Sequence, residues 1–192
     1  MNRTLAVLAA LAAVLAALGG CIPVMVAGAA GSAAMIATDR RSAGAQLDDE
    51  TIELKVTTRT NSEFGNRIHL NVTSYNGYVL LSGEAPDQGV IASVGNIAKT
   101  TEKVRGVHNE MVVGLLADFS ARSNDTYITS KVKSRMIEAN KFPPNVVKVV
   151  TERGVVYLMG IVSKEEGDAA AETAATTAGV VRVVKFFQYP TT

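Results

Sequence analysis

The sequence predicts an α+β protein in which one structural unit occurs twice in tandem. The string D-x-x-I-x-x-K-V begins at Asp49 and again at Asp125, an offset of 76 residues. The string V-x-L-x-G begins at Val79 and again at Val156, an offset of 77 residues. Repeated strings at a nearly constant offset are typical of duplicated units. In each copy the apolar spacing also changes from helical to alternating and back, so each unit is predicted as helix, strand, strand, helix, strand.

The first element of each copy is predicted to be an amphipathic helix. Apolar residues recur at spacings of four, at Ile52 and Val56 in the first copy. The face of the second helix that is expected to turn toward its own core holds Ile128, Val132, Met136 and Ala139. This spacing places the apolar side chains on one face of a helix.

A β-hairpin is predicted to follow the first helix in each copy. In the first copy, Asn76-Gly77 separates two segments in which apolar and polar residues alternate, which is a strong hairpin signal. In the second copy, Arg153-Gly154 occupies the equivalent position. The strand residues expected on one face are Ile68, Leu70, Val72, Val79 and Leu81, and then Val147, Val149, Val156 and Leu158.

A second helix and a last strand complete each unit. The helix is expected to be capped by Asp87 in the first copy, and by Ser163 with Glu166 in the second copy at capping-box spacing. The last strands are predicted at residues 107–113 and 180–187. A unit of this size buries only about 60% of its unfolded surface and is marginal alone, so we expect the two units to pack on each other.

The N-terminal segment indicates an exported lipoprotein. An apolar run from Leu5 to Leu18 behind Arg3 is typical of a signal peptide. Leu18-Gly19-Gly20-Cys21 looks like the bacterial lipobox, in which Cys21 is acylated, palmitate being the expected class of chain. Because Ile22 rather than Asp follows Cys21, the resemblance implies transport to the outer membrane. The predicted divisions are a signal peptide at 1–20, a lipidated tether at 21–46, domains at 47–116 and 124–190, and a linker at 117–123.

The composition argues against several classes of function. The chain has 19 basic and 18 acidic residues, one Cys, two His and no Trp, which disfavours a nucleic-acid binder, a structural zinc site and a disulfide framework. His69 and His108 are each expected in a strand without a nearby Cys or paired carboxylate. The acidic run that begins at Asp48 is interpreted as helix capping at a helix start. We therefore predict a protein that is not an enzyme, with no cofactor and no metal.

The order of elements, with Gly83 and Gly160 after the second strand of each copy, resembles the BON domain. A lipobox followed by two such copies is similar to the tandem-BON outer-membrane lipoproteins, through strings such as Asn71-Val72-Thr73 and Leu158-Met159-Gly160. The resemblance implies two tandem αββαβ domains, each a three-stranded mixed sheet packed on two helices, with Gly83 and Gly160 as structural glycines. It also implies binding of anionic phospholipid (phosphatidylglycerol or cardiolipin), a place at the division site and a role in envelope integrity.

The resemblance places the lipid contact on the first helix of the second copy, where members carry Trp at the position of Tyr127. At 100° per residue, the outward face of this helix holds Tyr127, Ser130, Ser134 and Ile137, flanked by Lys131 and Lys133, with Arg135 at its periphery. Aromatic and aliphatic side chains flanked by lysines are typical of a helix that lies in a membrane interface. The first copy has Thr51 in place of Tyr127 and an acidic helix. Packing of Tyr127 and Ile137 on the first copy, a contact with another envelope protein, and plain exposure remain alternatives.

Overall fold

The computed structural model describes residues 39–190, and from Arg40 onward these residues form one compact unit. The predicted signal peptide, Cys21 and the tether up to residue 38 lie outside the described residues. No helix in the described part of the chain combines the length and the apolar character that crossing a bilayer requires.

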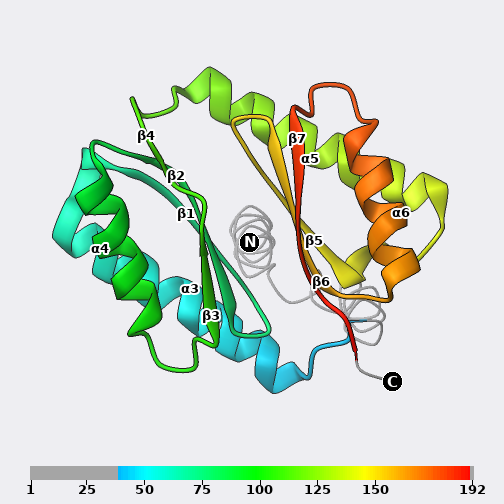
Figure 1. Ribbon diagram of the computed structural model, residues 1–192, viewed down its shortest axis with the longest axis horizontal. Coiled ribbons are helices and arrows are strands. Elements are labelled where there is room, and N and C mark those ends of the chain that lie inside the picture. The colour runs from blue at the N-terminus through cyan, green and yellow to red at the C-terminus, as the bar shows by residue number, and fades with distance from the viewer. Residues whose placement is uncertain (1–38, 191–192) are drawn as a thin grey trace, which may run out of the picture. The chain divides into compact units, whose positions relative to one another are not determined.

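The first repeat has two helices and a mixed sheet (Figure 1). Strands β1 and β2 are antiparallel, while β3 and β4 both run parallel to β2. The sequence predicts one last strand at 107–113, but the structure has two short strands, separated between Asn109 and Val112. The elements are α3 (Ala43–Phe64), a 3-10 turn (Gly65–Arg67), β1 (His69–Tyr75), β2 (Tyr78–Ala85), α4 (Gln88–Lys99), β3 (Gly106–Asn109) and β4 (Val112–Val113).

The second repeat has the same order of elements. Its sheet has the order β5-β6-β7, in which β5 is antiparallel and β7 parallel to the central strand. The elements are α5 (Phe119–Ala139), a 3-10 turn (Pro144–Val146), β5 (Val147–Glu152), β6 (Val155–Ile161), α6 (Lys164–Ala175) and β7 (Arg182–Gln188). The predicted α+β class, with a mixed sheet and two helices in each unit, is confirmed.

Turn and cap residues agree with the sequence pattern. Both residues of each hairpin turn have positive φ: 52° and 78° at Asn76-Gly77, and 53° and 73° at Arg153-Gly154. This is the backbone of the two-residue turn that matches strand twist. Asp87 caps α4, and Ser163 forms a capping box with Glu166 at the start of α6.

The first helix of each repeat begins earlier than predicted. Ser42 caps α3 and Asp118 caps α5, so residues 119–123 of the predicted linker belong to a helix. Asp49 therefore lies in the second turn of α3 and is not a capping residue, which corrects the interpretation of the acidic run. Ala139, at the end of α5, is exposed rather than part of the core face.

Each repeat has a core between its two helices and one face of its sheet. Ile52 and Val56 are buried in the first core, and Ile128, Val132 and Met136 are buried in the second, as the helical spacing predicts. All residues of these cores lie between positions 52 and 187. A chain that starts at Asp39 thus keeps every apolar cluster of the described protein.

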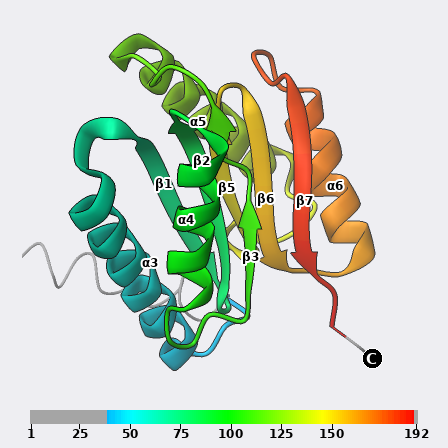
Figure 2. The same cartoon turned by 60° about the vertical axis from the view of Figure 1, so that its left-hand side comes forward.

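The other faces of the two sheets pack against each other. Tyr75 and Leu80 of the first repeat form one buried cluster with Tyr157 and Met159 of the second. The helices lie on the outer sides of the two sheets (Figures 1 and 2). Burial of its hydroxyl raises the pKa of Tyr157 to about 12. The expectation that the two units pack on each other is confirmed.

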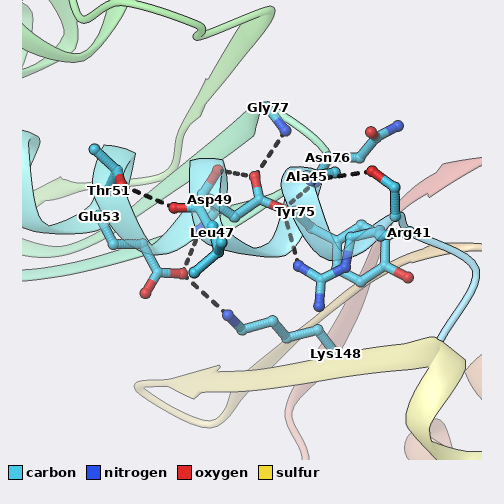
Figure 3. Close-up of polar contacts among 12 residues, drawn as sticks. Arg41, Ala45, Leu47, Asp49, Thr51, Glu53, Tyr75, Asn76, Gly77 and Lys148 are labelled. Atoms are coloured by element: carbon cyan, nitrogen blue, oxygen red, sulfur yellow. Dashed lines mark hydrogen bonds and ion pairs between the residues drawn. The ribbon is translucent and has the colours of Figure 1, made fainter. Parts of the chain in front are cut away.

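Polar contacts also join the repeats. Arg40, which precedes α3, makes two hydrogen bonds of 2.6 and 2.7 Å to the carboxylate of Glu166 at the start of α6. Lys148 of β5 lies 3.0 Å from the Glu53 carboxylate of α3, as Figure 3 shows. These partly exposed ion pairs add polar contacts between the repeats to the apolar ones.

Candidate membrane-contact site and the histidine cluster

The outward face of α5 carries two large apolar side chains. Tyr127 is 62% exposed and Ile137 is 60% exposed. Neither belongs to the apolar cluster between the repeats, which is built from sheet residues. The alternative in which these two side chains pack on the first repeat is therefore not the arrangement found. Their exposed surface is available to a membrane or to another protein.

The basic residues of this helix have different roles. Lys131 donates a hydrogen bond of 2.8 Å to the carbonyl of Ala178, just beyond α6, and its Nζ lies 5.2 Å from the centre of the Tyr127 ring. Arg135 donates to the Thr173 carbonyl at 3.2 Å and to the Thr177 hydroxyl at 2.8 Å. Cations at the C-terminal end of a helix stabilise it. These two side chains, predicted as lipid contacts, thus also hold the end of α6.

Unlike Lys131 and Arg135, Lys133 remains available to contact a ligand, as predicted for the basic residues of α5. It is exposed, and it makes no hydrogen bond or ion pair with the residues that the structure describes. Of the two predicted serines, Ser134 is exposed, whereas the Ser130 hydroxyl donates to the carbonyl of Thr126 at 3.0 Å. The outward face of α5 is therefore apolar at Tyr127 and Ile137 and positive at Lys133.

Sequence reasoning missed an apolar segment at the start of α5. Leu115 is 92% exposed and Phe119 is 80% exposed, and Leu116 between them is also exposed. At about 100° per residue, Phe119 and Ile137 lie at nearly the same angle on the helix, with Tyr127 within about 80° of both. The signal was a Leu-Leu-x-x-Phe string without alternation, in a stretch interpreted as linker. The exposed apolar stripe thus runs the whole length of the helix.

A polar cavity of about 520 Å³ lies beside this stripe, between α5, β5 and β1. Hydroxyl and basic side chains from α5 form one wall. The wall residues from α5 include Arg122, Thr126, Thr129, Ser130 and Lys133. The opposite side includes His69 from β1 and Glu152 from β5.

His69 lies between two carboxylates, which overturns the expectation that no paired carboxylate is near it. Its Nδ1 is 3.0 Å from an oxygen of Glu84 and 3.7 Å from an oxygen of Glu152. Burial raises the pKa of Glu152, and the charges of Glu84 and Asp125 act in the same direction, whereas His69 opposes them. The sequence could not show this cluster, because its members come from three strands of two domains.

His108 has a structural environment. Its ring stacks on Phe186 of the other repeat with 3.9 Å between the ring centres. Tyr78 and Tyr157 extend the stack on the two sides. Burial lowers the pKa of His108, and the nearby charge of Glu110 opposes this shift.

Comparison with known proteins places both repeats in one family. The BON domain family matches residues 48–114 and 124–191, one match for each repeat. This chain belongs to the BON domain family. The two repeats are its first and second BON domains.

Three relatives are similar to this chain over 72% to 90% of its length. It is 38% identical over 174 residues to the outer membrane lipoprotein DolP of Haemophilus influenzae, which covers 90% of each chain. It is 37% identical over 153 residues to the 21 kDa hemolysin of Actinobacillus pleuropneumoniae, which covers 79% of each. It is also 28% identical over 142 residues to the osmotically-inducible protein Y of Escherichia coli, which covers 72% of this chain and 71% of that protein.

Each BON domain has an aspartate at the same position of its first helix, Asp49 or Asp125, which links that helix to the hairpin by hydrogen bonds. The buried Asp49 carboxylate accepts hydrogen bonds from the Ser74 hydroxyl and from the backbone N–H groups of Asn76 and Gly77 at 2.6 to 2.8 Å (Figure 3). Arg41 also lies 2.8 Å from it. In the second BON domain, the equivalent Asp125 accepts from the two turn N–H groups at 2.8 and 2.9 Å. The aspartate of the repeated motif therefore has a structural role, holding the helix to the hairpin turn, and is not part of a ligand site.

Both predicted structural glycines face a backbone carbonyl. A Cβ on Gly83 would lie 2.1 Å from the carbonyl oxygen of His69, and the φ of Gly83 is 128°. A Cβ on Gly160 would lie 2.4 Å from the carbonyl oxygen of Val146. Such contacts leave no room for a side chain. In each BON domain, the second strand therefore passes close to the start of the first strand.

Proposed function

We propose that this BON protein is a periplasm-facing lipoprotein of the outer membrane that binds anionic phospholipid through the first helix of its second domain. The exposed stripe on α5 is the observation that carries the proposal: Tyr127 and Ile137 are more than half exposed, and Phe119 continues the stripe. Apolar side chains of this kind enter the headgroup boundary, while a cation such as Lys133 meets the phosphates. The similarity to DolP supports the outer-membrane location.

In this proposal the acyl chains on Cys21 supply one membrane signal and α5 supplies a second. A single weak signal gives reversible binding, whereas two signals together give stable attachment. The protein supports envelope integrity, acting at the division site. No chemical step is assigned to it, and it takes no nucleic acid.

The central test is binding of the chain from Asp39 onward to vesicles with and without phosphatidylglycerol or cardiolipin. Tyr127→Glu should reduce binding to anionic vesicles at least tenfold, since it adds repulsion and a desolvation cost. Thr51→Glu is the matched control, because Thr51 holds the equivalent position on α3 and is also exposed. Equal binding by Tyr127→Glu and the parent would overturn the lipid assignment.

The anchor has its own test. Cys21→Ser in cells should abolish the uptake of labelled fatty acid and leave an unprocessed or released protein. Normal labelling of that variant would contradict the lipoprotein assignment without bearing on α5. The two parts of the proposal can therefore fail separately.

A second function, docking on an envelope assembly or on a regulator of cell-wall hydrolases, is favoured by α3. This helix exposes Leu47 and Leu54, which are seven residues apart and thus on one face, among acidic side chains. Leu47→Glu with Leu54→Glu should then remove a protein partner from crosslinked envelopes and leave vesicle binding unchanged. Loss of vesicle binding in that variant would instead assign α3 to the membrane.

A further inference from the structure

We propose that His69, Glu84 and Glu152 form a binding site for a divalent transition-metal ion, Zn²⁺ in the first place, that links the two BON domains. Each of these side chains offers one donor atom, and the three atoms lie close to one another. The site does not depend on the lipid-binding proposal. It uses residues from both domains, and sequence spacing alone could not have placed them together.

The separations between the three donor atoms suit a small metal ion. His69 Nδ1 lies 3.0 Å from one oxygen of Glu84 and 3.7 Å from one oxygen of Glu152, and all three atoms lie within 4.8 Å of one another. Zinc binds imidazole nitrogen and carboxylate oxygen at about 2.0–2.2 Å, which sets tetrahedral donors roughly 3.4 Å apart. Closing the site around the ion requires the donor atoms, which lie up to 4.8 Å apart, to approach by at most about 1.4 Å.

The fold presents these residues from fixed strands. His69 and Glu84 are directly opposite partners in the antiparallel pairing of β1 and β2. Glu152 is the last residue of β5 in the second BON domain. The two sheets pack face to face, so the donor atoms are held by backbone that the apolar interface positions.

Glu152 is buried more completely than its partners explain, whereas Glu84 has several partners. The side chain of Glu84 is fully buried and that of Glu152 is 7% exposed. One oxygen of Glu152 accepts a hydrogen bond from the Ser82 hydroxyl at 3.5 Å, and the other lies 3.7 Å from His69 Nδ1, beyond hydrogen-bond distance. Buried carboxylates are costly unless they are paired or coordinate a metal. A divalent ion would neutralise both charges.

The surroundings supply an open side and a second layer of contacts. His69 and Glu152 line the cavity of about 520 Å³ beside α5, which gives access and room for a water as fourth ligand. The backbone N–H of Ala117 donates to Glu84 at 3.1 Å and orients that carboxylate. The guanidinium of Arg153 lies 3.4 Å from the other Glu84 oxygen, and its side chain is half exposed.

The donor set favours zinc over calcium or magnesium. One imidazole nitrogen with two carboxylate oxygens is typical of transition-metal sites, whereas calcium and magnesium prefer oxygen ligands alone. The ion binds the lone pair on Nδ1 of the neutral His69 imidazole, and the ring proton is then carried by Nε2. The bound ion would hold β1 and β2 of one domain to β5 of the other.

The test is zinc binding by the metal-free chain from Asp39 onward, purified without a histidine tag. Calorimetry and native mass spectrometry should detect one equivalent of Zn²⁺, and ZnCl₂ should raise the melting temperature by several degrees. Glu152→Gln and His69→Gln should each weaken binding at least tenfold. His108→Gln and Glu53→Gln are matched controls, because they change the other histidine and another carboxylate at the domain interface, and they should bind like the parent.

A spectroscopic measurement on the unaltered chain keeps the proposal testable if a variant fails to fold. The chain has two histidines, so their ring signals can be assigned by NMR. Zinc should shift the His69 signals and leave those of His108 in place. Arg153→Gln should strengthen binding, because it removes the cation that competes for Glu84. The proposal is overturned if the parent takes up no stoichiometric zinc, if the His69 signals do not respond, or if Glu152→Gln and His69→Gln bind zinc as tightly as the parent.

Discussion

The first helices of the two BON domains have equivalent places on equivalent sheets but present different surfaces. Helix α3 carries five acidic and two basic side chains, whereas α5 carries two acidic and four basic side chains. At equivalent positions α3 has Ala43, Thr51, Thr57 and Asn61, where α5 has Phe119, Tyr127, Lys133 and Ile137. The core faces remain alike, because each must fill the same space against a sheet.

The charges of α3 are also engaged within the protein. Asp48 lies 2.6 Å from Lys103, and Glu53 pairs with Lys148 of the second BON domain. On α5, Lys133 has no such partner among the described residues. The two first helices thus share a buried half, whereas these outward charges of α3 are paired within the protein and the outward face of α5 leaves Tyr127, Ile137 and Lys133 exposed.

The largest effect should come from the glycines that both BON domains share. Gly83→Ala and Gly160→Ala each place a Cβ within 2.4 Å of a backbone carbonyl oxygen, so each should destabilise the fold by about 3 kcal/mol or more. Thermal unfolding followed by circular dichroism measures this loss. Gly44→Ala is the control, since its Cβ would meet nothing closer than 3.8 Å. An unchanged melting temperature in either glycine variant would show that the two domains are not built alike.

Removing the charge of Asp49 or of Asp125 should lower the stability of the protein by different amounts. Asp49→Asn removes the charge that accepts three hydrogen bonds and faces Arg41, whereas Asp125→Asn affects two hydrogen bonds. Hydrogen bonds to a charged group contribute about 1.5–3 kcal/mol each at most, so both variants should lose stability and Asp49→Asn should lose more. Urea unfolding gives the comparison. A larger loss for Asp125→Asn would contradict the count of contacts.

The lysines of α5 should separate binding from stability. Lys133→Gln should reduce binding to anionic vesicles about fivefold with no change in melting temperature, since each cation near such a surface contributes about 1 kcal/mol. Lys131→Gln should lower the melting temperature slightly, because the Ala178 carbonyl loses its donor. Lys55→Gln, at the position of α3 that is equivalent to Lys131, should leave vesicle binding unaffected. Raised salt should weaken binding by the parent and diminish the difference from Lys133→Gln.

The smallest effect concerns pH and the interface between the domains. Because burial lowers the pKa of His108 below 6.5, the unfolded chain takes up a proton at this residue before the folded chain does. The contribution of this residue to stability should therefore fall as the pH drops through about 6.5. His108→Gln should remove that part of the pH dependence. Urea unfolding at pH 7.5 and 5.5 measures it, and an unchanged slope would contradict the role of this ring.

Much of each BON domain follows from short-range pattern in the sequence. The D-x-x-I-x-x-K-V repeat, the Asn76-Gly77 turn and the Ser163 capping box predict the elements and their order, because each depends on residues a few positions apart. The outward stripe of α5 could also be predicted, since helical periodicity separates the buried face from the exposed one. The Leu-Leu-x-x-Phe segment was accessible to the same reasoning but was interpreted as linker.

Only the tertiary structure decided what covers the second face of each sheet. The runs Val79-Leu80-Leu81 and Val156-Tyr157-Leu158-Met159 are continuously apolar, which indicates burial on both faces but does not name the partner. Packing of the two sheets brought Glu152 to His69 and Glu84, whose separation in sequence hides the cluster. Packing of α5 beside α6 within the second domain directs Lys131 and Arg135 to the end of α6. Local periodicity reports that a side chain is buried or exposed, whereas its partner depends on long-range packing that no local pattern encodes.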